Sequence, residues 1–149
     1  MGPPATEPIG VQLARTAKVA RRAFDQALDG VGASLPTWSI LVSVKGQHHG
    51  AQRALAEAVG IEGATLTHHL NRMEKAGLVT RRRDPDNRRV HLVELTAAGE
   101  EMFDRCLATV VAFDARLRGD LTTAELAGFS SVLGRIRTHV TEPTEAVLS

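Results

Sequence analysis

The chain has 149 residues, 43% hydrophobic and 23% charged, and its 18 basic and 17 acidic side chains leave a formal net charge of +1. These values are ordinary for one globular domain, or for a small domain with a dimerisation extension, and no segment approaches the ~18 uninterrupted apolar residues of a membrane span. Residues 1–8 contain no secretion signal and the single Cys106 cannot form an internal disulfide, so we expect a cytoplasmic protein with no membrane partner.

The N-terminal region is expected to hold one long helix. Residues 1–8 are rich in proline and are expected to be disordered. Apolar residues then recur every three or four positions from Leu13 onward, which predicts a helix over residues 10–30. The opposite face carries three cations, which either form a solvated face or bind an anion: Arg15, Lys18 and Arg22.

A second helix is expected to begin at residues 35–37 (LPT), because proline is tolerated in the first turn of a helix. Trp38, Leu41 and Val42 give it an apolar face, on which Trp38 is interpreted as a core residue. Residues 45–51 are expected to form a polar loop.

Residues 52–77 have the pattern of a helix-turn-helix. A short helix over residues 52–59 is closed by Gly60, and residues 60–63 turn into a second helix. Leu66, Leu70 and Met73 fall at i, i+4 and i+7, so one face of the second helix is buried, and this helix ends before Gly77. Polar side chains on the other face and its flanks are expected to contact DNA: Thr65, Thr67, His68, Asn71, Arg72 and Lys75.

A basic hairpin is expected to follow the helix-turn-helix. Residues 78–83 and 90–95 have the composition of strands, and the turn-forming residues 84–87 separate them. Residues 72–91 contain seven basic and three acidic side chains, a net +4 within a chain of +1. A helix for the major groove beside cations for the phosphates suits duplex DNA, whereas the alternative is a solvated, arginine-rich hairpin. The hairpin residues assigned to DNA are Arg83, Arg88 and Arg89.

Metal binding and catalysis are not expected. Two histidine pairs, residues 48–49 and 68–69, invite a metal assignment, but adjacent histidines point in different directions and lack the spacings of zinc sites. The sequence contains no phosphate-binding, dinucleotide-binding, metalloprotease or nucleophile-elbow motif. We therefore expect neither an enzyme nor a cofactor.

The C-terminal region is expected to form two helices. Thr96 is placed as the N-cap of a helix over residues 97–117, with inner positions at Phe103, Leu107, Val110, Val111 and Leu117. Thr122 and Glu125 then match a capping box. The terminal helices carry more apolar surface than the small winged domain covers, which favours a second copy of the chain as partner. The residues assigned to this dimer interface are Leu13, Phe129, Leu133, Ile136 and Val140.

Residues 55–102 (LAEAVGIEGATLTHHLNRMEKAGLVTRRRDPDNRRVHLVELTAAGEEM) resemble the helix-turn-helix and wing of the MarR/SlyA family of bacterial transcription regulators. The weaker likeness extends over residues 9–140. Two positions depart from the family pattern: Asn87 replaces an aspartate before the paired arginines of the wing, and His68 stands where many relatives have arginine or serine. Some relatives sense peroxides through a cysteine near the first helix, where this chain has none.

The resemblance implies a mostly α, α+β winged-helix fold with four regions. These are a disordered N-terminus (residues 1–8), an N-terminal dimerisation helix (9–34), a winged helix-turn-helix DNA-binding domain (35–96) and C-terminal dimerisation helices (97–149). It also implies a homodimeric regulator on a pseudo-palindromic double-stranded operator, more often a repressor. Relatives bind small aromatic acids in a cleft beside the first helix, which here points to Lys18, Arg22 and Trp38. The alternative is a winged helix that binds an acidic protein partner.

Overall fold

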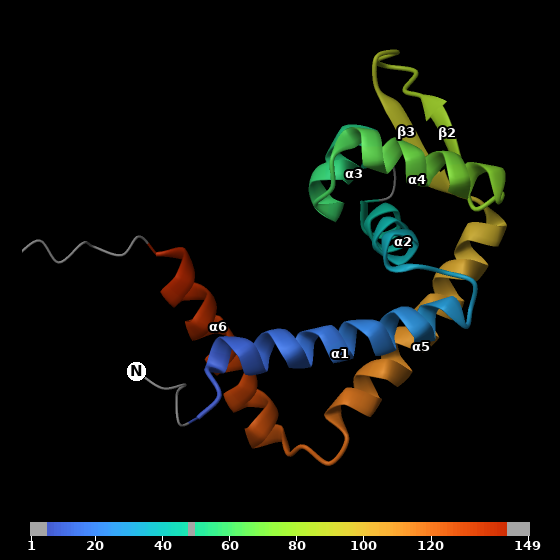
Figure 1. The fold of residues 1–149 in the computed structure, drawn as a ribbon. Helices are drawn as coiled ribbons and strands as arrows, with labels where there is room; N and C mark the ends of the chain where they lie inside the picture. Colours follow the sequence, from blue (N-terminus) through green and yellow to red (C-terminus); the bar gives the residue numbers. More distant parts are fainter. Residues whose placement is uncertain (1–5, 48–49, 143–149) are drawn as a thin grey trace, which may run out of the picture. The chain divides into compact units, whose positions relative to one another are not determined.

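A computed structural model describes residues 6–47 and 50–142 of the chain. Its elements follow the order α1 (Ile9–Asp29), α2 (Leu35–Gln47), β1 (Gly50–Ala51), α3 (Gln52–Val59), α4 (Gly63–Lys75), β2 (Val79–Arg83), β3 (His91–Leu95), α5 (Ala97–Arg118) and α6 (Thr123–Thr141). Figure 1 shows this order along the chain. Within the described residues, six helices and one small sheet confirm the predicted mostly α winged-helix fold. The chain divides into two compact units, Met1–Phe113 and Asp114–Ser149.

The turns around the helix-turn-helix rest on two glycines. Gly60 and Gly77 both have φ of +74°, a left-handed conformation that favours glycine. After Gly60, the Ile61 amide donates to the Ala56 carbonyl at 3.2 Å, and after Gly77 the Leu78 amide donates to the Met73 carbonyl at 2.9 Å. These bonds satisfy carbonyls at the two helix ends and confirm both predicted stops.

The first unit has a core built mainly from α2, α3, α4 and the sheet, and Leu28 of α1 and Met102 and Cys106 of α5 belong to the same buried cluster. Leu66, Leu70 and Met73 are buried, as their spacing predicted. On α2 the buried residues are Ile40, Leu41 and Val44, whereas Val42 is 41% exposed and does not belong to the inner face. Leu55, Val79 and Val93 complete the centre of this core.

The sheet has the order β1-β3-β2, and both pairings are antiparallel. In the hairpin Val79 pairs with Leu95 and Arg83 with His91, so the strands match the predicted ones within one residue. In Figure 1 this hairpin projects beyond α3 and α4. The prediction of a loop over residues 45–51 was wrong, because α2 continues to Gln47 and Gly50–Ala51 pairs with β3. A strand of two residues is too short to show the alternation of apolar and polar side chains that predicts a strand, because only backbone pairing with its neighbour defines it.

The start of α5 is fastened to the turn between α4 and β2. Thr96 caps the helix, because its hydroxyl accepts from the Gly99 amide at 3.0 Å and donates to the Gly77 carbonyl at 2.5 Å. The Thr96 amide donates to the Leu78 carbonyl at 3.0 Å. A Cβ at Gly99 would lie 2.0 Å from that same carbonyl oxygen. Only a glycine lets the helix approach the turn this closely.

The inner side of α5 differs from the predicted one. The buried residues are Gly99, Met102 and Cys106, while Phe103 is half-buried. Leu107 and Val111, predicted to face inward, are 42% and 60% exposed, and Leu117 in the second unit is also exposed. Apolar residues occur on more than one side of this helix, so the periodicity alone did not decide which side faces the core of its own chain.

Aromatic contacts join α5 to α1 and α2. Trp38 of α2 stacks on Phe103 with ring centroids 5.6 Å apart, and Lys45 pairs with Glu100 while lying over the same Phe103 ring. Phe24 of α1 meets Phe113 at 5.1 Å.

The second unit contains the last turn of α5 and the whole of α6. The predicted capping box is present, since Thr122 accepts from the Glu125 amide and Glu125 accepts from the Thr122 amide. No residue within Thr123–Thr141 is buried. Phe129 and Val140 are 59% and 76% exposed.

Three sequence assignments fall partly or wholly on residues outside the described ranges. They are the disordered N-terminus at residues 1–5, the first histidine pair at residues 48–49 and the end of the C-terminal region at residues 143–149. Within the described part of the N-terminus, Glu7 forms an ion pair with Arg15 and its carbonyl accepts from the Gln12 side-chain amide. Among the helices that the structure describes, none is long and apolar enough to cross a membrane.

Candidate nucleic-acid interface

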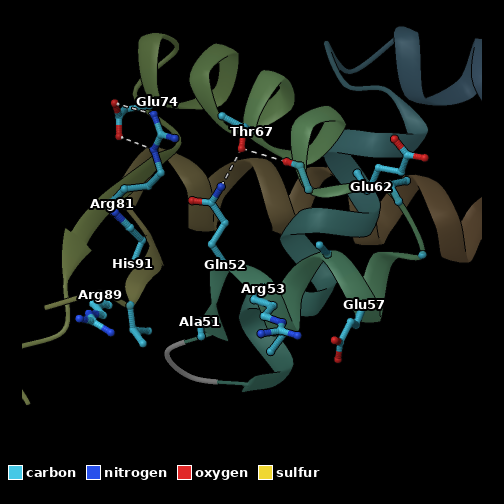
Figure 2. A pocket seen from close by; sticks show the side chains of 16 residues that line it. Ala51, Gln52, Arg53, Glu57, Glu62, Thr67, Glu74, Arg81, Arg89 and His91 are labelled. Atoms are coloured by element: carbon cyan, nitrogen blue, oxygen red, sulfur yellow. Dashed lines mark hydrogen bonds and ion pairs between the residues drawn. The ribbon is translucent and has the colours of Figure 1, made fainter. Parts of the chain in front are cut away.

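A groove of about 1500 Å³ runs between the helix-turn-helix and the wing. Residues from the start of α3, the turn before α4, one flank of α4 and both hairpin strands line it. Figure 2 shows them around the open space, with Gln52 and Arg53 from α3, Thr67 and Glu74 from α4, and Arg81, Arg89 and His91 from the hairpin. Polar and basic side chains therefore converge here from three elements.

The outer face of α4 is directed to solvent. Opposite the buried stripe of this helix, five of the predicted contact residues are exposed: Thr65, His68, Asn71, Arg72 and Lys75. Their neighbour His69 is half-buried, and its ring centroid lies 5.8 Å from that of His68. Within residues 6–47 and 50–142, no group of three or more histidine, cysteine or acidic side chains is placed to hold a metal ion.

Thr67 is the exception among the predicted contact residues of α4. Its hydroxyl donates to the Gly63 carbonyl at 2.9 Å and accepts from the Gln52 side-chain amide at 2.9 Å, as the dashed lines in Figure 2 show. A hydroxyl has only one proton to donate. Because that proton is committed inside the helix, Thr67 serves to hold Gln52 against α4 rather than to donate to a base.

Arg81 ties β2 to α4. Its guanidinium donates to both carboxylate oxygens of Glu74, at 3.1 and 3.3 Å, and to the side-chain oxygen of Asn71 at 2.5 Å. The hydrogen bond from Arg81 is the main reason that the pKa of Glu74 lies below its ordinary value. The Arg81 side chain is only 20% exposed. It is therefore a link within the protein and not a free cation for phosphate.

Five of the seven basic side chains within residues 72–91 have no partner among the residues that the structure describes. Arg82 forms an ion pair with Glu94 at 2.8 Å, which raises the pKa of its guanidinium, and Arg81 is bound to Glu74. In the described part of the chain, no side-chain hydrogen bond or ion pair engages the others: Arg72, Lys75, Arg83, Arg88 and Arg89. All five are exposed.

The tip of the wing is shaped by side-chain acceptors. Asp84 accepts from the Asp86 amide at 2.8 Å, and Asn87 accepts from the Arg89 amide at 3.2 Å. Such contacts two residues along the chain are typical of Asx turns, which asparagine and aspartate both form. Asn87 thus keeps the turn although it lacks the negative charge that relatives place before the arginines.

Several residues labelled around this groove in Figure 2 were not assigned to DNA from the sequence, among them Gln52, Arg53, Glu74, Arg81 and His91. Gln52 and Arg53 were assigned only to a short helix, whose apolar positions gave the signal. Gln52 and Arg53 were detectable in principle, because the first residues of a helix-turn-helix pair lie near the DNA backbone.

The residues assigned to a ligand lie at two separate places. Lys18 and Arg22 line a surface cavity of about 680 Å³ between α1 and the start of α2. Arg21 in the same cavity pairs with Asp25 at 3.0 Å. Trp38 is half-buried, stacks on Phe103 and is not part of the cavity lining. The structure therefore groups the two cations but not the tryptophan.

Comparison with known proteins supports the fold. A model of the MarR family matches residues 34–91. The uncharacterised HTH-type transcriptional regulator YdgJ of Bacillus subtilis (strain 168) is 31% identical over 90 residues, which are 60% of this chain and 55% of that protein. The match thus spans little more than half of the length of this curated relative.

Two solved structures are similar over most of both chains. A MarR family transcriptional regulator from Rhodococcus sp. RHA1 is 28% identical with a TM-score of 0.72, covering 86% of this chain and 91% of that one. CouR from Rhodococcus jostii RHA1, in a crystal structure bound to p-coumaroyl-CoA, is 27% identical with a TM-score of 0.72, covering 87% of this chain and 92% of that one. These matches support the resemblance seen in the sequence: residues 34–91 match the MarR family, whose members are transcriptional regulators, and the chain shares the fold of solved MarR family regulators.

Proposed function

We propose that this protein is a sequence-specific, double-stranded DNA-binding regulator that acts as a homodimeric repressor. The observation that carries the proposal is the exposed outer face of α4 together with five cations that have no partner within residues 6–47 and 50–142. Two of these cations, Arg88 and Arg89, lie at the tip of the wing. In this arrangement α4 enters the major groove while the wing cations neutralise phosphates or enter the adjacent minor groove. Residues 35–96 form the DNA-binding domain.

A dimer is proposed because the terminal helices expose apolar side chains. Leu13 of α1 and Leu107 of α5 are 38% and 42% exposed in the first unit, and Phe129 and Val140 of α6 are exposed in the second. Leu133 and Ile136 are half-buried. A second copy that covers these residues gives a two-fold assembly of regions 9–34 and 97–149, and its two α4 helices then match a pseudo-palindromic operator.

The DNA proposal is tested by fluorescence anisotropy with the purified full-length protein. The labelled probe is the duplex upstream of its own coding sequence, and the matched control is a shuffled duplex of the same length and composition. We expect tighter binding to the upstream duplex and a steep loss of affinity with added salt. Equal affinity for both duplexes, together with capture of an acidic polypeptide, would favour the alternative of an acidic protein partner.

Release by a small aromatic or phenolic acid is proposed as the regulatory signal. The cavity beside α1 offers Lys18 and Arg22 to a carboxylate, and no ion pair or hydrogen bond within the described residues occupies either cation. A similar protein, CouR, binds p-coumaroyl-CoA in its crystal structure. Such a ligand acts only if it prefers the conformation that does not bind the operator.

Calorimetric titration with salicylate tests the site. We expect saturable binding that is lost in Arg22→Ala, together with release of the operator duplex at the same concentrations. The matched control is Arg21→Ala, which removes a cation already paired with Asp25 and should leave binding in place. Titration of salicylate and related acids without heat or operator release would show that these acids are not the effector.

A further inference from the structure

We propose that Arg81 fixes the orientation of the Asn71 side-chain amide, so that Asn71 selects a base whose major-groove edge presents hydrogen-bond acceptors, guanine or thymine, over adenine. Asn71 is then a specificity-determining residue and Arg81 its positioning residue. The inference rests on the proposed DNA-binding function and specifies what one position of the operator contains.

Hydrogen bonds to Glu74 hold the Arg81 guanidinium in a fixed position next to Asn71. Glu74 accepts from Arg81 Nε at 3.1 Å and from Nη2 at 3.3 Å, so two bonds anchor the planar group. Nη2 then lies 2.5 Å from Asn71 Oδ1. Arg81 pairs with the buried Val93 across the hairpin, which places its side chain on the inner face of β2. The Arg81 guanidinium is thus positioned by its place on β2 and by its two hydrogen bonds to Glu74.

The chemistry of the pair decides which way the amide faces. A guanidinium carries only donors, so the atom of Asn71 that meets Arg81 must be the oxygen, and the amide nitrogen points away. The nitrogen of Asn71 makes no hydrogen bond to any residue that the structure describes. At about 100° per residue around the axis of α4, Asn71 points in a direction between those of Glu74, on the flank of the helix, and His68, on its outer face. The amide nitrogen is therefore the group presented toward the groove of DNA.

This orientation changes what an asparagine selects. A free asparagine pairs with adenine in two bonds, in which the amide oxygen accepts from N6 and the amide nitrogen donates to N7. With its oxygen bound to Arg81, Asn71 offers donors. Guanine presents two adjacent acceptors, N7 and O6, and thymine presents O4. Adenine N7 can still accept one bond from the amide nitrogen, but the N6 donor beside it then has no acceptor on Asn71, and cytosine presents only a donor at N4. Asn71 therefore favours guanine or thymine.

The experiment selects bound duplexes from a random pool with the full-length protein. The operator position that Asn71 contacts is identified as the one that Asn71→Ala relaxes, and competition binding then measures each base there. Wild type should favour guanine or thymine over adenine by about five- to a hundredfold, the range expected for one good base contact. In the Arg81→Met variant the affinity for duplexes with adenine at this position should rise relative to the other bases, because the Asn71 amide is free to turn.

Arg82→Met is the matched control, because it removes a neighbouring arginine that is also ion-paired but lies on the outer face of the same strand. It should keep the wild-type base preference. Asn71→Asp is a second variant that leaves Arg81 intact. One carboxylate oxygen accepts from Arg81 and the other replaces the donor, so the preference should move toward cytosine.

The outcomes separate this inference from the proposed function. A wild type that binds its operator but prefers adenine at the position of Asn71 would overturn the inference alone. The same holds if Asn71→Ala relaxes no position or if Arg81→Met, folded by its thermal transition, keeps the wild-type profile. If Arg81→Met does not fold, a failure of Asn71→Asp to move the preference overturns it. A wild type that selects no duplex overturns both.

Discussion

At the scale of single residues, we propose different tasks for the cations of the wing and those of α4. Arg89 lies on the wing beside Asn87 and is proposed to contact phosphate, whereas Arg72 lies on the exposed face of α4 and is proposed to contact base edges. Arg89→Ala should weaken binding to all sequences and lower the salt slope by about one for each phosphate that a subunit no longer neutralises. Arg72→Ala should cost about 1–3 kcal/mol on the operator and relax one of its positions.

Anisotropy titrations over a range of salt, with operator and random duplexes, distinguish the two effects. Arg83→Ala is a useful comparison, since Arg83 is exposed at the end of β2 and carries the same charge. Equal loss on operator and random DNA for both Arg72→Ala and Arg89→Ala would show that this division of tasks is wrong.

Cys106 is expected to lower the free energy of unfolding at alkaline pH. Burial raises the pKa of its thiol, so the folded state holds the thiol proton more tightly than the unfolded state. Below the ordinary thiol pKa both states are protonated and nothing changes. As pH rises above that value the unfolded state ionises first, and the free energy of unfolding should fall by at most about 1.4 kcal/mol per pH unit from this group.

Urea unfolding of wild type and Cys106→Ala at about pH 7 and about pH 10 measures this effect. Other groups titrate in both proteins, so the quantity of interest is the difference between them. Wild type should lose more stability than Cys106→Ala on going to alkaline pH. An identical loss in the two proteins would mean that the thiol is not shielded from water.

Single side chains also show where sequence reasoning stops. The spacing of Leu66, Leu70 and Met73 predicted which side chains of α4 face outward, because helical geometry alone sets that direction. It did not predict that Thr67 is bound to Gln52 or Asn71 to Arg81. Those partners come from other elements, and their positions depend on how the elements pack.

At the scale of elements, the fastening of α5 to the turn after α4 is the most constrained contact. Gly99→Ala would place a methyl group 2.0 Å from the Leu78 carbonyl oxygen, and backbone cannot yield as a flexible side chain would. We expect Gly99→Ala to destabilise the protein by at least about 1–3 kcal/mol, the usual cost of overpacking. Equilibrium unfolding in urea measures this change.

Gly46→Ala provides the control, since Gly46 lies in α2 and a Cβ there meets nothing within 4 Å. It should be neutral or stabilise by up to about 1 kcal/mol, because alanine favours a helix over glycine. A Gly99→Ala variant as stable as Gly46→Ala would contradict the close approach of α5 to the turn.

Elements with a strong period or a clear stop were predicted well from the sequence. The helix-turn-helix, the hairpin and the capping box of α6 have their boundaries within a residue or two, because glycines, threonines and alternating apolar residues act locally. The inner face of α5 was not predicted, since Leu107 and Val111 are as apolar as Met102 and Cys106. Which of these sides meets its own chain depends on tertiary packing.

At the scale of the whole molecule, the proposed dimer depends on the apolar positions of α6. Ile136→Asp would place an unpaired charge in the proposed interface, so we expect monomers or insoluble protein. Light scattering at micromolar concentration measures the mass. Thr138→Asp is the matched control, because it adds the same charge on the exposed side of the same helix and should remain dimeric.

A stable wild-type monomer at micromolar concentration would defeat the dimer proposal, and so would a dimeric Ile136→Asp. The sequence indicated surplus apolar surface on the terminal helices, and the exposure of Phe129 and Val140 agrees with that surplus. The sequence did not predict the symmetry of the assembly, because that symmetry depends on contacts with a second copy of the chain.

The contact between Trp38 and Phe103 gives the protein an optical signal of its own. The chain has one tryptophan and no tyrosine, so emission excited at long ultraviolet wavelengths arises at a single place. That place is the junction of α2 with α5, where the indole stacks on Phe103 and Lys45 pairs with Glu100. Opening of this junction exposes the indole to water and shifts its emission to longer wavelength. The separation of the winged region from its supporting helix can thus be followed in real time without a label.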